Sequence, residues 1–141
     1  MILILLVSSR QAASWLIYQG EAVRFKKRFS FGRGEDKALQ RLDAFLKKHH
    51  IKFTQLRGLV LLVQEASLTQ VKIFSTMINT IAWQLDRPLT ADFYFSQPWE
   101  KALTRCLTRL KKQHHFRPVP IKYQYKPDII ISKSLANKRK Y

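Results

Sequence analysis

The histidines of this sequence do not have the spacing that metal binding requires. The four histidines form two adjacent pairs, His49-His50 and His114-His115. Neighbouring residues on a helix point in different directions, so one pair does not easily chelate one ion. No cysteine or carboxylate cluster accompanies either pair, whereas structural zinc sites need four nitrogen or sulfur ligands. We therefore predict no metal site and interpret the first pair as the cationic end of a helix.

The candidate nucleophiles and acids also lack suitable neighbours. Cys106 falls on the apolar stripe of an expected helix, as a small core residue would. Ser67 lacks the Gly-x-Ser-x-Gly turn of hydrolases. The nine carboxylates are scattered, with Glu35-Asp36 the only adjacent pair, and four glycines are too few for a phosphate-binding loop. We predict that the chain is not an enzyme and holds no cofactor.

The charge of the chain indicates its partners. Lys and Arg total 26 and Asp and Glu total 9 among 141 residues, which gives a net charge of +17. Such a charge favours a nucleic acid, an anionic membrane or an acidic protein, and it also suits a surface that only confers solubility. No apolar run approaches the ~18 residues of a membrane span. The single cysteine excludes an internal disulfide and fits a reducing cytoplasm, where we expect the protein.

Aromatic residues interleave with cations in two places. The first group contains Phe25, Phe29 and Phe31 with Arg24, Lys26, Lys27 and Arg28, and the second contains Tyr123 and Tyr125 with Lys122 and Lys126. Stacking combined with charge binds single-stranded nucleic acid. A strand with aromatics in the core and cations in solvent produces the same pattern. The sequence favours this second interpretation for the first group and leaves both open for the other.

The hydrophobic pattern predicts a single α/β domain. Apolar or alternating runs predict strands at 2–7, 14–18, 22–31 and 59–63, with further short strands at 89–95, 121–125 and 128–131. Apolar residues at helical spacing predict helices at 35–49, 69–85 and 99–112, with a basic tail at 132–141. Three antiparallel strands followed by parallel additions form a mixed sheet of the RNase H-like or actin-like ATPase type with flanking helices.

The second expected helix is apolar over more than one face. Apolar residues recur along 69–85 at positions that surround most of the helix circumference. Such a helix is packed on two sides. One side can contact the sheet, and the other needs a second helix or another protein.

The stretch from Gly58 to Leu89, GLVLLVQEASLTQVKIFSTMINTIAWQLDRPL, resembles a diverged segment of the TsaB family, also called YeaZ. That family has an apolar strand, the loop G-P-G-S-F-T-G-x-R, and an apolar helix that ends before Pro-Leu. Without a gap, four residues fall on the Ser, Phe, Thr and Arg of that loop: Ser67, Leu68, Thr69 and Lys72. The first strand and the helix near residue 40 follow in the family's order, so the resemblance covers about residues 1 to 90.

The resemblance implies an organisation and a role. Residues 1–95 would form a TsaB-like, RNase H-like part, and 96–141 a basic helix, short strands and a tail packed on the same domain. The family is a non-catalytic scaffold that pairs with the TsaD enzyme in making the threonylcarbamoyladenosine of tRNA. This chain has Leu6 at the position of the first-strand Asp and Gln70 at that of a loop glycine, so nucleotide and metal binding are not implied.

The resemblance also places the partner surface on the two helices near residues 35–48 and 69–85. For the TsaD-like partner, we expect contacts from Lys37, Gln40, Arg41, Ala44, Lys72, Thr76, Asn79, Thr80 and Trp83. For RNA, we expect contacts from Lys111, Lys112, Arg117, Lys122, Lys126, Lys133, Lys138, Arg139 and Lys140. The same helices could form a homodimer. The alternative function is a stand-alone nucleic-acid-binding protein on the same fold.

Overall fold

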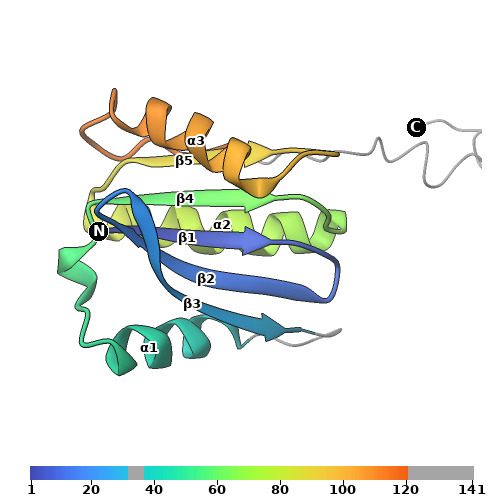
Figure 1. Ribbon diagram of the computed structural model, residues 1–141, viewed down its shortest axis with the longest axis horizontal. Helices are drawn as coiled ribbons and strands as arrows, with labels where there is room; N and C mark the ends of the chain where they lie inside the picture. Colours follow the sequence, from blue (N-terminus) through green and yellow to red (C-terminus); the bar gives the residue numbers. More distant parts are fainter. Residues whose placement is uncertain (32–36, 121–141) are drawn as a thin grey trace, which may run out of the picture.

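The computed structural model describes residues 1–31 and 37–120, which contain five strands, three α-helices and one 3₁₀ turn (Figure 1). In chain order these are β1 (Ile2–Val7), β2 (Ala12–Gln19), β3 (Ala22–Ser30), α1 (Ala38–Lys48), η1 (Phe53–Gln55), β4 (Gly58–Val63), α2 (Leu68–Leu85), β5 (Leu89–Phe93) and α3 (Trp99–Leu110).

The strands form one mixed sheet in the order β3-β2-β1-β4-β5. β1 pairs with β2 and β2 with β3 in antiparallel fashion, and β4 and β5 are added parallel to β1. β1 and β4 lie side by side at the centre, and β4 is buried at every residue. A central strand covered on both faces has no polar side, which explains the continuous apolar runs. The predicted antiparallel start with parallel additions is confirmed.

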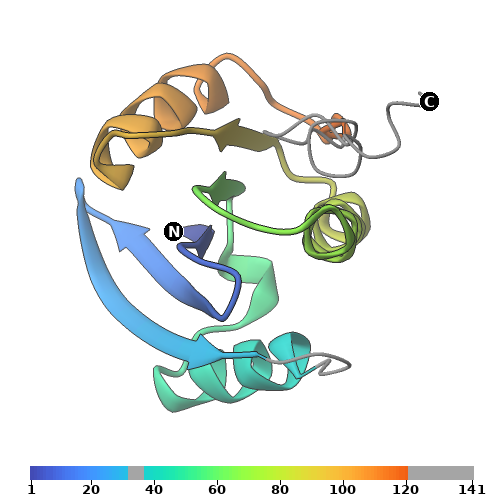
Figure 2. The same cartoon turned by 90° about the vertical axis from the view of Figure 1, so that its right-hand side faces the viewer.

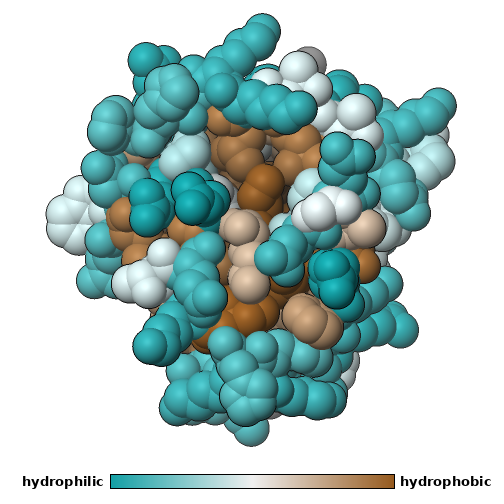
Figure 3. Space-filling model, turned by 60° about the vertical axis from the view of Figure 1, so that its left-hand side comes forward, coloured by the Kyte–Doolittle hydropathy of each residue, from teal (hydrophilic) through white to brown (hydrophobic). Residues whose placement is uncertain are grey.

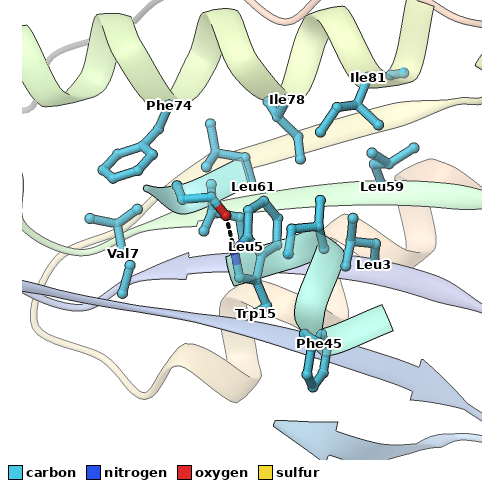
Figure 4. Packing of buried hydrophobic residues seen from close by; sticks show 14 of the residues in the cluster. Leu3, Leu5, Val7, Trp15, Phe45, Leu59, Leu61, Phe74, Ile78 and Ile81 are labelled. Carbon is cyan, nitrogen blue, oxygen red and sulfur yellow. Dashed lines mark hydrogen bonds between the residues drawn. The ribbon is translucent and has the colours of Figure 1, made fainter. Parts of the chain in front are cut away.

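Helices cover both faces of the sheet, with α1 and α2 on one and α3 on the other (Figure 2). Because side chains alternate along a strand, Leu3 and Leu5 join the core under α1 and α2, whereas Ile4 and Leu6 face α3. Figure 4 shows Phe74 and Ile78 of α2 above the side chains of β1 and β4. The stripe predicted for α3 is confirmed, since Leu103, Cys106 and Leu110 are buried.

Several element boundaries differ from those predicted. The second strand is longer than 14–18, because Ala12 and Ala13 are buried and already pair in the sheet. Between α1 and β4 the chain forms η1, where the Lys52 N–H donates to Gln55 Oε1 at 2.7 Å. Among the described residues, the first helix begins at Ala38. The predicted strands at 121–125 and 128–131 and the tail at 132–141 lie outside the described residues.

Gly58 begins β4 where α3 approaches the sheet. A Cβ added at this position would lie 2.7 Å from Leu110 Cδ2, closer than carbon atoms tolerate. Leu110 is itself buried, so its side chain must shift to admit the added methyl group. We expect Gly58→Ala to lower the free energy of unfolding by about 1–3 kcal/mol, the usual cost of overpacking. Urea denaturation measures this value, and an unchanged midpoint would show that α3 shifts freely.

Among the described helices, none combines the length and the apolar composition that crossing a membrane requires.

Candidate interaction surface

An apolar groove of about 800 Å³ lies between α1, η1 and α2. Leu39 of α1, Phe53 of η1 and Ile73 of α2 line it with 50%, 37% and 46% of their surfaces exposed. The full lining is Leu39, Phe53, Lys72, Ile73, Thr76, Met77, Thr80, Ile81, Gln84 and Leu85. Large apolar side chains gathered in one exposed concavity are typical of a binding surface.

The groove arises because α2 carries two apolar faces. Phe74 and Ile78 point to the sheet, while Ile73 and Met77, one residue earlier in each turn, line the groove. Consecutive residues lie about 100° apart around a helix, so both faces follow from one apolar run. The prediction that α2 has more apolar surface than the sheet covers is confirmed.

The structure brings only part of the predicted partner surface to this groove. Of the α2 residues, Lys72, Thr76 and Thr80 line it. Trp83 is outside the lining and 65% exposed.

The α1 part of the predicted surface lies elsewhere. Lys37, Gln40 and Ala44 are exposed but do not line the groove. The Arg41 guanidinium lies 5.9 Å from the centre of the Phe29 ring of β3. The groove's contact on α1 is instead Leu39, which belongs to the apolar repeat of this helix. Half of the Leu39 surface is exposed.

The Asn79 side chain is hydrogen-bonded to the segment that follows α3. The Val119 N–H donates to Asn79 Oδ1 at 2.8 Å, and Asn79 Nδ2 donates to the Val119 carbonyl at 3.1 Å. Asp86, which follows the last residue of α2, accepts a hydrogen bond from the Phe116 N–H. This bond is the largest cause of the lowered pKa of the Asp86 carboxyl, and the hydrogen bond with the His115 side chain is the second. Segment 115–119 is therefore held against α2, and a partner cannot bind the Asn79 amide without displacing it.

The loop that resembles the TsaB motif forms a helix cap. Ser67 Oγ accepts a hydrogen bond from the Gln70 N–H at 3.2 Å, and Gln70 Oε1 accepts one from the Ser67 N–H at 2.9 Å. Gln70 Nε2 also donates to the Arg10 carbonyl, which ties the loop to the β1–β2 turn. Leu68 and Thr69 begin α2 directly after this cap. The Ser67 hydroxyl thus has a structural role at the start of the helix.

We expect Ser67→Ala to lower the free energy of unfolding by about 1 kcal/mol, because the Gln70 N–H loses its acceptor at the helix start. Thr69→Ala is the matched control, since Thr69 is exposed in the same turn. Urea denaturation of both variants measures the difference. Equal midpoints would show that the cap contributes nothing.

The other candidate chemical groups are placed as core residues or on the surface. Cys106 is buried, and burial raises the pKa of its thiol, so it is a poor nucleophile. Across residues 1–31 and 37–120, no group of three or more His, Cys, Asp or Glu side chains is placed to hold a metal ion. Of the expected RNA contacts, Lys111, Lys112 and Arg117 are exposed. The other six lie outside the described residues.

The phenylalanines of the first aromatic group point into the core. Phe29 is buried and stacks on Trp15, with ring centres 6.4 Å apart. Phe25 stacks on His49 at 3.8 Å, and Phe31 meets Phe74 at 5.2 Å. The interpretation with aromatics in the core is confirmed for this group, and stacking on RNA bases is wrong for it.

The end of the molecule that carries the N-terminus comes forward in Figure 3, where apolar side chains gather at the centre and hydrophilic ones surround them. A pocket of about 390 Å³ has Ile2, Tyr18 and Lys111 among its lining residues.

The pKa of the N-terminal amine is lowered, first because the amine is partly buried and second because the positive charge of Arg57 is nearby.

The chain matches no family model and no curated protein, but it is similar to solved structures. YeaZ from Pseudomonas aeruginosa matches with a TM-score of 0.57 and 16% identity, over 65% of this chain and 44% of that one. A structure described as an uncharacterized protein with similarity to peptidase YEAZ from Pseudomonas aeruginosa matches with a TM-score of 0.57 and 17% identity, over 65% and 42%. This chain has a YeaZ-like fold.

The YeaZ fold agrees with the mixed sheet and confirms the predicted RNase H-like, actin-like class. At 16–17% identity the likeness concerns the fold alone. The match spans less than half the length of each of these two solved structures.

Proposed function

We propose that this chain is a non-catalytic, TsaB-like scaffold that pairs with a TsaD-like enzyme in threonylcarbamoyladenosine modification of tRNA. The apolar groove between α1, η1 and α2 carries the proposal, because it is the surface that a partner would cover. Its α2 wall contains Lys72, Thr76 and Thr80 beside Ile73. Polar residues at the margin of an apolar centre are the usual arrangement of a protein interface.

The candidate reactive groups support a scaffold better than an enzyme. The Ser67 hydroxyl accepts the Gln70 N–H, and the Cys106 thiol is buried with a raised pKa. Neither is prepared for attack on a peptide bond, the reaction that the word peptidase in one neighbour's description suggests. The Ser67 loop contains Gln70 where the family motif has glycine, and its side chain closes the loop against Arg10.

Covering the groove would remove large apolar surfaces from water. Leu39, Ile73 and Phe53 each keep more than a third of their surface exposed. Burial of such side chains contributes roughly 25 cal/mol for each Å² removed from water. A helix pair with an apolar face from the TsaD-like partner is the occupant that we propose, and a second copy of this chain would compete for the same groove.

Light scattering on a size-exclusion column tests this function. The protein is mixed with the TsaD-like protein of the same organism, and the mass of the eluting species is measured. A one-to-one complex is expected. Separate elution of the two proteins at micromolar concentration would contradict the scaffold role, and a stable homodimer that excludes the TsaD-like protein would assign the groove to self-association.

A further inference from the structure

The edge strand β3 carries four exposed cations. The exposed cations are Arg24, Lys26, Lys27 and Arg28. The next residue along the strand, Phe29, is buried. None of these four residues takes part in an ion pair within residues 1–31 and 37–120, where the acidic partners are Glu65, Asp43, Asp92 and Asp86. Within the described residues, these four charges therefore have no carboxylate partner.

The sheet register divides these cations between the two faces. Lys26 pairs with Leu16 and Arg28 with Ser14, and Leu16 belongs to the core on the α3 side. Because paired residues share a face, Lys26 and Arg28 lie on that side of the sheet. Residues two apart on a strand are separated by about 6.8 Å, so the two charges form a short row along the edge.

No described helix lies over this row. α3 packs against β4 and β5, at the opposite edge of the sheet from β3 (Figure 2). On the α1 side, Phe25 stacks on His49 and Phe29 on Trp15, so these rings are not presented among the cations. A surface that inserts into a lipid bilayer needs apolar side chains between its cations. The β3 surface instead offers a linear row of charge without such groups.

We propose that Lys26 and Arg28 bind the phosphate backbone of RNA. A row of cations is complementary to a linear polyanion, and Arg and Lys on phosphates supply sequence-independent affinity. The choice of RNA rests on the proposed function, which makes tRNA the nucleic acid that the complex meets. Lysines on an edge strand also prevent edge-to-edge association of sheets, and that purpose alone predicts no binding of RNA.

The test measures tRNA binding by the isolated full-length protein through fluorescence anisotropy, with no TsaD-like protein present. We expect the double variant Lys26→Glu/Arg28→Glu to bind a labelled tRNA at least about tenfold more weakly at moderate salt. The control Lys48→Glu/Lys52→Glu makes the same change in charge at exposed residues outside β3 and should lose less than about threefold. The dependence of the binding constant on salt should become shallower only in the β3 variant.

Several outcomes would overturn the proposal. Equal losses in both variants, or no loss in either, would show that β3 is not the binding surface. Self-association of the β3 variant with unchanged RNA affinity would leave edge protection as the role of these cations.

A milder variant is used if circular dichroism shows that the charge reversal prevents folding. That variant is Lys26→Gln/Arg28→Gln, and we expect it to bind tRNA at least about threefold more weakly. Because no TsaD-like protein is present, failure here does not affect the pairing result, and failure of pairing does not affect this one.

Discussion

Replacing Ile73 with aspartate is expected to weaken pairing with the TsaD-like protein by about 100-fold. Ile73 is 46% exposed in the groove, beside Met77 and Thr76, and a partner that fills the groove would bury it. The variant loses an apolar contact and places a charged carboxylate in the apolar interface. Hot-spot changes of this kind cost about 2–4 kcal/mol, and 1.4 kcal/mol corresponds to tenfold in affinity.

The matched control is Gln40→Asp, which introduces the same carboxylate on α1. Gln40 is exposed and follows Leu39 by one residue, but it does not line the groove. Isothermal titration of each variant with the TsaD-like protein should give a loss below about threefold for this control. A larger loss for Gln40→Asp than for Ile73→Asp would move the interface to the outer face of α1, and an unchanged affinity for Ile73→Asp would leave the groove without this function.

Replacing Trp15 with alanine is expected to lower the free energy of unfolding by about 3–5 kcal/mol. Trp15 is fully buried and stacks on Phe29, and its indole Nε1 donates to the Ala38 carbonyl at 3.1 Å (Figure 4). Its removal leaves a large cavity and takes away a hydrogen bond that joins β2 to the first turn of α1. Small domains have only about 5–15 kcal/mol of stability, so the loss is a large part of the total.

Trp83→Ala is the control for this prediction, because Trp83 is 65% exposed on α2. Its removal should change the free energy of unfolding by less than about 0.5 kcal/mol. Urea denaturation followed by circular dichroism measures both variants. If Trp15→Ala cost no more than Trp83→Ala, the core between β2 and α1 would not have the packing described.

The sequence could predict the sheet because its central strands have no polar side. The apolar runs at 2–7 and 59–63 predict two strands, which the structure shows as the adjacent β1 (Ile2–Val7) and β4 (Gly58–Val63). The excess of apolar residues on α2 likewise predicts a surface beyond the sheet. Both predictions depend on local pattern, which the fold preserves.

Individual site residues were harder to predict, because helical spacing does not show what each side chain meets. Leu39 and Leu42 continue one apolar stripe, yet Leu42 is buried and Leu39 is half exposed at the groove. Asn79 was expected to face a partner, but its side-chain amide is hydrogen-bonded to the backbone of Val119, forty residues later. No local pattern encodes a contact over that separation.

One structural feature did have a signal in the sequence. Ser67 followed three residues later by Gln70 is the pattern of a capping box, and it precedes an apolar run. That pattern explains why Gln70 stands where the TsaB motif has glycine: its side chain closes the helix start.

Affinity capture of the tagged full-length protein from its native lysate, with and without ribonuclease, tests the scaffold role most directly. We expect a TsaD-like protein to be recovered in both cases and identified by mass spectrometry. It should be lost with Ile73→Asp but retained with Gln40→Asp. Recovery of RNA alone, abolished by ribonuclease or by high salt, would contradict the scaffold role and leave a stand-alone nucleic-acid-binding protein on a YeaZ-like fold.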